Sequence, residues 1–347
     1  MSIAYVGCRT TAERNARGKG ISVYHVDDAT GAWTLLQILE DLVNPSFLCF
    51  DNEQRFLYTV HGDGTTASSF AIDADGRIHL LNTVPIGGRN PVFLTPDADN
   101  SFIYVASLQG GAVAVCRRLP DGSLSEPIHM VHLEGKAESG VSHAHQCVFD
   151  PSGAYLLVPT QGRRIGYGGV FVFRKEPDGA LTRTDRWLAR EHDEPRHLIF
   201  HPNGRFAYLL NEHGNCVTFF HFDRKTGTLE AKQIVSTLPE TWTKEGWASE
   251  LCISPDGRYL YASNRSHDSV AQLSVDPHTG YMRFLECTPC LGRTPRFMTL
   301  TPDGSYLLVA NEDSDTIRIF SLDPEDGRLS FTGYTVETGS PTCILWK

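Results

Sequence analysis

Residues 194–208 read Glu-Pro-Arg-His-Leu-Ile-Phe-His-Pro-Asn-Gly-Arg-Phe-Ala-Tyr, and this stretch holds the pattern that decides the fold. An apolar run follows a proline, a Pro-Asn-Gly turn comes next, and a second apolar run begins at Phe206. Short apolar runs joined by a turn of Pro, Asn and Gly are typical of antiparallel β-strands. The second run resembles six other stretches of the same chain.

This second run occurs seven times at nearly even intervals. The central residues of the copies lie 46 to 53 residues apart and are Tyr5, Tyr58, Tyr104, Leu157, Tyr208, Tyr261 and Leu308. A third run follows in which apolar and polar residues alternate, as in residues 316–320, and a fourth follows an Asp/Gly turn. Four strands per repeat without helical periodicity indicate a propeller blade. The sequence therefore predicts an all-β, seven-bladed β-propeller with four antiparallel strands per blade.

The two ends of the sequence predict how the ring closes. The chain starts at the second strand of a blade, and residues 340–346 match the opening run of the other blades. We expect this C-terminal strand to pair with the N-terminal blade, because that pairing leaves no blade open. Residues 1–347 would then form a single domain with no internal boundary.

Composition and charge exclude several classes of protein. The net charge is −10 and no run of Lys or Arg occurs, which argues against nucleic acid and anionic membranes as partners. No apolar run approaches the roughly 18 residues of a membrane span. The first residues lack the basic and apolar segments of a secretory signal, and nine cysteines is an odd count for a disulfide framework. We therefore expect a cytoplasmic protein.

The predicted topology assigns the loops to two faces. The start of each first strand and the end of each second strand lie at one mouth of the central channel, and the tight Pro-Asp-Gly turns lie on the opposite face. The longest insertions fall at the first mouth and span residues 8–20, 131–144, 161–169 and 234–248. Because long loops on a rigid scaffold often carry function, we expect the functional site at this mouth.

Charged residues recur at equivalent positions of this mouth. Arginines clustered in an acidic protein are suited to hold a small carboxylate or phosphate, and a neighbouring His or Glu can act as a base or an acid. The catalytic candidates are His145, Arg196, Glu212 and Arg265. The candidates for substrate binding are His143, His197, Arg296, Arg9 and His61.

The same positions also admit a purely structural interpretation. Arg196 and Glu212 can form an ion pair within one blade. Side-chain oxygens are present at Asn44, Asn90 and Glu250, but no spacing of ligands dictates a metal. The sequence therefore predicts neither a metal nor an organic cofactor.

Several motifs together make the chain similar to a known family. They are residues 194–208 with Asn211-Glu212, residues 253–258 with Ser263-Asn264-Arg265, Thr294-Pro295-Arg296-Phe297 and Tyr5-Val6-Gly7. Over its whole length the chain resembles the bacterial lactonase family, typified by propeller-type 6-phosphogluconolactonase and by fungal 3-carboxy-muconate cyclase. The resemblance implies hydrolysis or formation of a lactone ring without a cofactor. For the cyclase branch it implies a site formed by Arg196, Glu212 and Arg265, with His145 or His143 as the histidine.

The sequence departs from the family pattern on the expected pocket side. The departures are Ser107-Leu108, Thr160-Gln161-Gly162, His61-Gly62 and a basic loop at residues 7–17. The principal hypothesis is an enzyme that hydrolyses a small anionic lactone, with sugar-acid and phosphosugar-acid lactones first. The alternatives are a cycloisomerase that closes a muconate-type diacid, and a non-enzymatic propeller that binds a ligand or a protein. The sequence leaves the oligomeric state open.

Overall fold

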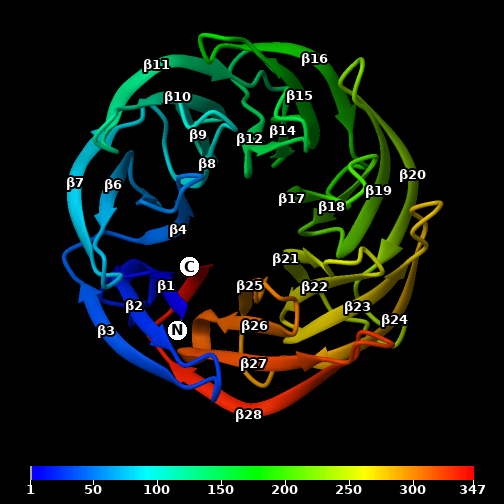
Figure 1. The fold of residues 1–347 in the computed structure, drawn as a ribbon. Coiled ribbons are helices and arrows are strands. Elements are labelled where there is room, and N and C mark those ends of the chain that lie inside the picture. The colour runs from blue at the N-terminus through cyan, green and yellow to red at the C-terminus, as the bar shows by residue number, and fades with distance from the viewer. Residues whose placement is uncertain (1) are drawn as a thin grey trace.

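The strands of the protein form seven sheets arranged as a ring around a central channel (Figure 1). The structure is a computed structural model that describes residues 2–347, and Met1, with which the predicted domain begins, lies outside the described residues. The chain passes around the ring once, as the colour gradient in Figure 1 shows. The predicted seven-bladed β-propeller is confirmed.

The first four sheets contain the following strands, given from the channel outward. The first sheet is β29 (Pro341–Trp346), β1 (Ser2–Cys8), β2 (Ile21–Val26) and β3 (Trp33–Leu39). The second is β4 (Pro45–Phe50), β5 (Phe56–His61), β6 (Thr66–Ile72) and β7 (Ile78–Pro85). The third is β8 (Pro91–Pro96), β9 (Phe102–Ser107), β10 (Ala112–Arg118) and β11 (Leu124–His132). The fourth is β12 (His143–Ala144) with β13 (Val148–Phe149), then β14 (Tyr155–Gln161), β15 (Gly169–Lys175) and β16 (Leu181–Leu188).

The remaining three sheets follow the same order. The fifth is β17 (Pro195–Phe200), β18 (Phe206–Asn211), β19 (Cys216–Asp223) and β20 (Thr228–Ser236). The sixth is β21 (Trp247–Ile253), β22 (Tyr259–Arg265), β23 (Ser269–Val275) and β24 (Met282–Pro289). The seventh is β25 (Pro295–Leu300), β26 (Tyr306–Asn311), β27 (Thr316–Leu322) and β28 (Leu329–Glu337). Two short 3₁₀ helices, η1 (Ala12–Arg14) and η2 (Glu312–Ser314), lie in loops.

The fourth blade differs from the predicted four continuous strands. Its inner strand is split into β12 and β13, and both halves pair with β14. Residues 145–147 lie in the break, where the N–H of His145 still donates to the carbonyl of Pro159 at 2.9 Å. The break leaves His145 outside the regular ladder at the mouth of the channel.

The two ends of the chain close the ring as the sequence predicts. Strand β29 pairs antiparallel with β1, with Tyr5 opposite Leu345 and Val6 opposite Ile344. The backbones of Ile3 and Lys347 exchange two hydrogen bonds of 2.8 Å. The first sheet is therefore built from both ends of the chain, which lie close together in Figure 1.

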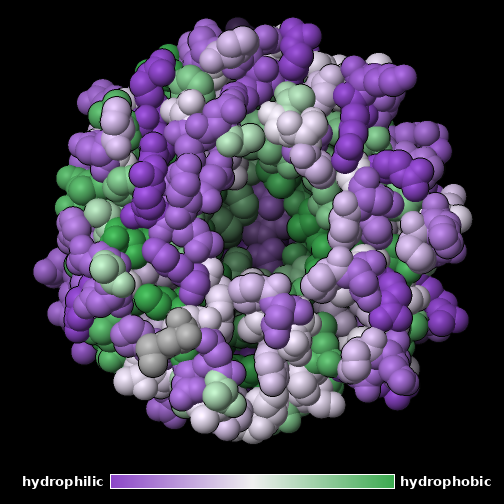
Figure 2. Space-filling view, viewed as in Figure 1, coloured by the Kyte–Doolittle hydropathy of each residue, from purple (hydrophilic) through white to green (hydrophobic). Residues whose placement is uncertain are grey.

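The core lies between adjacent blades. Each hydrophobic cluster combines residues of neighbouring sheets, as where Tyr208 and Phe219 of the fifth blade pack with Leu251 and Leu260 of the sixth. On the face seen in Figure 2 the surface is mostly hydrophilic, and hydrophobic residues line much of the channel wall. Among the described residues, no helix is long and apolar enough to cross a membrane.

Candidate active site

A β-bulge near the start of the inner strands positions the residues of the site. In β17, Pro195 is opposite Asn211 and His197 is opposite Leu210, so Arg196 is an extra residue with no partner in the ladder. Equivalent extra residues are Ser46, Val92, Arg296 and Thr342. A bulge redirects side chains that would otherwise point to opposite faces of the strand. For this reason both Arg196 and His197 line the same cavity.

The residue before each strand-opening proline also has an unusual backbone. It lies in the left-handed region, with φ of 53° at Glu194, 58° at Thr294 and 42° at Ser340. The carbonyls of these three residues accept the backbone N–H of Glu212 at 2.8 Å, Glu312 at 3.0 Å and Arg9 at 3.1 Å, in that order. This local geometry fixes three charged residues at the channel mouth.

A cavity of about 280 Å³ opens at this mouth, and guanidinium groups dominate its polar lining. The arginines that line it are Arg9, Arg14, Arg163, Arg196, Arg265 and Arg296. Among the residues that the structure describes, two carboxylates line it, those of Glu212 and Glu250, while Asp63 and Glu312 pair with arginines at its edge. The cavity is therefore cationic in a chain whose net charge is −10.

Glu212 is held as a carboxylate by two neighbours from different blades. Its Oε1 accepts a hydrogen bond from the Arg265 guanidinium, and its Oε2 accepts one from the Gln161 amide. Burial alone would raise the pKa of Glu212, but the charges of Arg265 and Arg196 outweigh burial and lower this pKa to about 2. Glu212 is therefore ionised throughout the neutral pH range.

Arg196 is a buried cation without a carboxylate in direct contact among the described residues. Its side chain belongs to a residue that is 5% exposed, its Nε donates to the carbonyl of Ser249 at 2.6 Å, and its Nη1 contacts the imidazole of His145. Within residues 2–347 no carboxylate lies within ion-pair distance of this guanidinium. Burial lowers the pKa of Arg196 to about 9, since together with the charges of Arg265 and Arg296 it outweighs the opposing charge of Glu212. An incoming anion would relieve this unfavourable environment.

Two histidines meet beneath Arg196. The ring centroids of His145 and His197 are 5.1 Å apart. Burial and the charge of Arg196 hold the pKa of His145 well below its ordinary value, so its imidazole is neutral at neutral pH. His197 donates from Nδ1 to Glu250 Oε1 at 2.8 Å, and its buried Nε2 has no partner among the described residues.

Aromatic rings form a layer at the same level as His197. The centroids of Phe47 and Phe93 are 4.1 Å apart, and Phe297 lies 6.1 Å from Phe47. Phe93 lies 5.6 Å from the ring of His197. The cationic cavity thus has an aromatic floor, which lowers the local dielectric around the two histidines.

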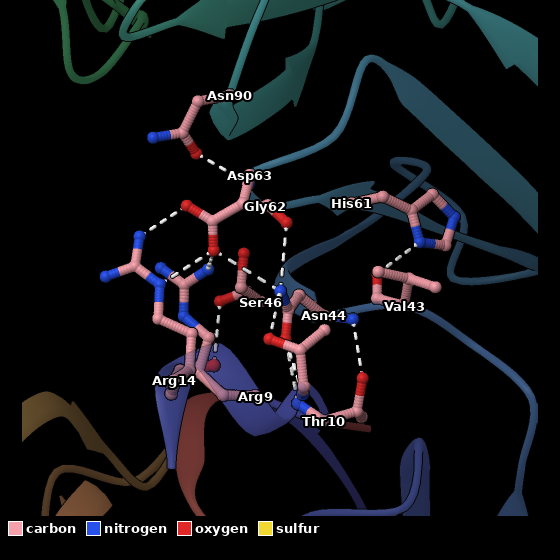
Figure 3. Close-up of polar contacts among 12 residues, drawn as sticks. Arg9, Thr10, Arg14, Val43, Asn44, Ser46, His61, Gly62, Asp63 and Asn90 are labelled. Carbon is pink, nitrogen blue, oxygen red and sulfur yellow. Dashed lines mark hydrogen bonds and ion pairs between the residues drawn. The ribbon is translucent and has the colours of Figure 1, made fainter. Parts of the chain in front are cut away.

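A second charged group, shown in Figure 3, closes one side of the cavity. Asp63 accepts a hydrogen bond from Arg14 Nε at 2.7 Å and lies 3.3 Å from Arg9 Nη1. Burial and the charge of Arg296 lower the pKa of Arg9 to about 10. The amide oxygens of Asn44 and Asn90 accept backbone N–H groups of Thr10 and Asp63, each at 2.8 Å, so they position loops.

Most of the residues predicted from the sequence come together in this cavity. Those that line it are His145, Arg196, Glu212, Arg265, His197, Arg296 and Arg9. His61 does not: its Nδ1 donates to the carbonyl of Val43, its Nε2 contacts Ser68, both at 2.7 Å, and Figure 3 shows its ring apart from the arginines. His143 does not either, because its Nδ1 donates to the carbonyl of Leu108 at 2.8 Å.

Several charged residues of the site were not among the predicted ones. Arg14 and Arg163 reach the cavity from the long loops 8–20 and 161–169, while Asp63 and Glu312 balance arginines at its edge. The ion pair considered between Arg196 and Glu212 is not formed, since Glu212 pairs with Arg265 of the next blade. The basic character of loop 8–20 was the one available signal for Arg14.

Comparison with known proteins identifies the family. The sequence matches the family described as Lactonase, 7-bladed beta-propeller, over residues 3–346. The chain belongs to this lactonase family. The resemblance inferred from the sequence motifs is thereby confirmed.

Individual proteins named as lactonases are similar to the chain over most of its length. A 6-phosphogluconolactonase of Bacillus subtilis is 28% identical over 301 residues, which are 85% of this chain and 83% of that protein. A 6-phosphogluconolactonase of Pectobacterium carotovorum is 28% identical over 252 residues, 72% of each chain. The solved structure of the periplasmic gluconolactonase of Pseudomonas aeruginosa is 31% identical, covers 99% of this chain and 98% of its own, and has a TM-score of 0.90.

Proposed function

We propose that the protein hydrolyses a small anionic sugar-acid or phosphosugar-acid lactone in the cationic cavity. The observation that carries this proposal is Arg196, a buried guanidinium with no carboxylate partner among the described residues. Six arginines around one small cavity favour an anionic substrate, and the lactonase family supplies the reaction class. The names of the relatives point to gluconolactone or its 6-phosphate.

The proposed reaction is addition of water to the lactone carbonyl followed by opening of the ring. Neutral His145 takes a proton from the attacking water, and the new C–O bond places negative charge on the carbonyl oxygen. Arg196, with Arg265 beside it, stabilises this oxyanion. The carbonyl then re-forms, the bond to the ring oxygen breaks, and the protonated His145 returns the proton to that oxygen.

Glu212 has an orienting role in this scheme. A carboxyl group with a pKa of about 2 has no proton to donate at neutral pH. Its contacts with Arg265 and Gln161 instead fix the direction of the guanidinium that faces the substrate. The geometry therefore supports an orienting role for Glu212 over proton donation.

His197 is a second candidate base. Its Nδ1–H is held by Glu250, which leaves the lone pair on Nε2 without a hydrogen bond from any described residue. A carboxylate that orients one imidazole nitrogen while the other accepts a proton is a recurring catalytic arrangement. His143 does not line the cavity, which favours His145 and His197 as the histidines of the site.

The test is to follow acid release from aldonic and phosphoaldonic lactones by the purified protein at mildly acidic pH, where spontaneous opening is slow. The wild-type protein should accelerate at least one of these lactones. Arg196→Gln should lower kcat/KM by about 100-fold or more, the usual effect of removing one oxyanion donor. Arg258→Gln is the matched control, because Arg258 is exposed and paired with Asp256 on the opposite face.

Two outcomes would contradict the proposal. One is a rate equal to spontaneous hydrolysis with every lactone, and the other is an Arg196→Gln variant as active as Arg258→Gln. Loss of the ultraviolet absorbance of a muconate-type diacid would identify cycloisomerisation instead. A protein that binds these compounds without converting them would support the non-enzymatic alternative.

A further inference from the structure

A second cavity lies on the face of the tight turns, between the seventh and the first blades. Its volume is about 390 Å³, and it is lined by the β2–β3 turn on one side and by the β25–β26 turn on the other. These turns lie at the ends of the strands opposite to the cationic cavity. The second cavity therefore sits at the seam that closes the ring in Figure 1.

We call the boundary between two adjacent blades a seam. The contacts at the other seams show why a cavity remains at this one. In most blades the central tyrosine of the second strand packs under the turn between the third and fourth strands of the next blade. Four of these hydroxyl groups donate to a turn glycine carbonyl at 2.7 to 3.0 Å: Tyr5 to Gly76, Tyr104 to Gly179, Tyr208 to Gly280 and Tyr261 to Gly327. An aromatic ring thus fills the seam and ties two blades together.

In two blades the second strand has leucine in place of this tyrosine. In only one of the two does another aromatic ring fill the space beneath the turn. Beside Leu157 the ring of Tyr155 covers the turn, where a Cβ built on Gly227 would lie 2.2 Å from Tyr155 Cε1. Beside Leu308 the corresponding residue is Tyr306, which is 42% exposed. A Cβ built on Gly31 would have no described atom within 4 Å. The seventh seam is therefore left unfilled.

The walls of this seam cavity are aromatic. Trp33 and Trp346 line it with centroids 5.7 Å apart and ring planes at 66°, and Tyr306 and Tyr334 line it from the seventh blade. Both tryptophans belong to the first blade, and rings that meet at a steep angle form a corner in which a cation can contact more than one π face. The size of the cavity falls in the range of small-molecule sites.

The rim of the seam cavity is acidic. Asp27 and Asp303 line it, and no described Lys, Arg or His does. Backbone N–H groups of Thr30 and Ala29 lower the pKa of Asp27, and hydrogen bonds from Thr301 and Ser305 lower that of Asp303. The carboxylates of Asp27 and Asp303 are therefore ionised at neutral pH, and their charge complements that of a positively charged ligand.

We propose that the seam cavity between the first and seventh blades binds a small organic cation of the alkylammonium type. The aromatic corner would contact the alkyl groups of the ammonium head, and the carboxylates at the rim would supply the opposing negative charge. This site is independent of the lactonase site, since the two cavities share no lining residue.

The experiment compares choline with 3,3-dimethyl-1-butanol, its uncharged isostere, by calorimetric titration of the full chain and by tryptophan fluorescence. Choline should bind saturably, and the isostere should bind at least tenfold more weakly. Leu308→Tyr restores the residue found in five other blades, so it should fill the cavity and abolish choline binding. Lactone hydrolysis by this variant should equal that of the wild type, which shows that it is folded.

A second variant removes charge without touching the core. Asp27→Asn combined with Asp303→Asn should weaken choline binding by tenfold or more, and both residues are exposed. The proposal is overturned by the absence of saturable choline binding, by equal binding of the isostere, by a preference for a neutral sugar, or by unchanged binding in either variant.

Discussion

Glu212 shows how strongly the cavity constrains a single ionisable group. Its carboxylate lies among guanidinium groups, and the structure places it between Arg265 and Gln161. In Glu212→Gln the guanidinium of Arg265 loses its charged partner and is no longer held in one orientation. The value of kcat/KM should therefore fall by about 100-fold. Steady-state kinetics on the lactone that the wild type hydrolyses fastest measures this. Glu286→Gln on the outer strand β24 serves as the control and should keep full activity.

The same substitution has a pH-dependent effect on stability. The folded-state pKa of Glu212, about 2, lies below the roughly 4.3 expected for an unfolded chain. Its stabilising contribution is thus present in full above pH 4.3 and is lost as the pH falls toward 2. Denaturant unfolding should show wild type more stable than Glu212→Gln at pH 7, with a difference that shrinks between pH 5 and pH 3. A difference independent of pH would contradict the ion pair.

The histidines predict the shape of the pH–rate profile. Burial and neighbouring positive charge lower the pKa of His145, so its basic form persists below the ordinary histidine value of about 6.5. The acid limb of kcat/KM should therefore lie below pH 6.5. His145→Gln should remove this limb along with most activity, whereas His278→Gln in an exposed turn should change neither. A limb at pH 7 or above would rule out His145 as the base.

At the residue scale, the sequence predicted site residues best where the repeat fixed their position within the strand. Arg196 and Arg296 could be aligned because each follows a strand-opening proline. His61 could not be placed correctly by alignment alone, since its direction depends on hydrogen bonds to Val43 and Ser68. Arg163 and Asp63 lie beyond the strands, where no periodicity specifies the path of the chain.

At the scale of single elements, the left-handed residue before each strand-opening proline is a point of backbone strain. Thr294 has φ of 58°, a value that β-branched residues rarely adopt, whereas the equivalent Asn44 and Asn90 tolerate it better. Thr294→Asn should be more stable than Thr294→Ala by about 1 kcal/mol, because both lose the hydroxyl and only Asn favours this region. Thermal or denaturant unfolding measures the difference, and equal stability would contradict the strain.

The strands were easier to predict than their irregularities. Alternation and turns predicted four strands per blade, but the bulges at Arg196 and Arg296 leave no separate mark in the pattern. The split between β12 and β13 was equally hidden, because residues 143–149 align with the opening strands of the other blades. Both features arise from pairing between strands, which a periodicity within one segment does not report.

At the scale of the whole molecule, stability depends on joining the two ends of the chain. Strand β29 provides the innermost strand of the first blade and buries Cys343 and Ile344. A chain lacking residues 341–347 should expose the edge of β1, unfold roughly 10 °C or more below the full chain, and aggregate. Calorimetry and light scattering measure these changes. A synthetic peptide of residues 338–347 should restore stability, and an unaltered melting temperature would contradict the closure.

The ring itself was predicted almost completely, since seven similar repeats leave few other architectures. The family also followed from the motifs, and the match over residues 3–346 confirms it. The cavity chemistry needed the structure, because several of its arginines have partners in other blades, as Arg265 does with Glu212 and Arg196 with the carbonyl of Ser249. Cytoplasmic location stays a prediction.

The bulged residue at the start of the inner strands has a practical consequence. Because it stands outside the hydrogen-bonded ladder, its side chain can be exchanged without disturbing the interior of the blade. Apart from His145 and Arg196, which carry the proposed chemistry, the corresponding positions are 46, 92, 249, 296 and 342. A combinatorial library randomised at these positions would vary the shape and charge around the substrate while keeping the propeller fold intact. Selection from it offers a direct route to enzymes with altered specificity.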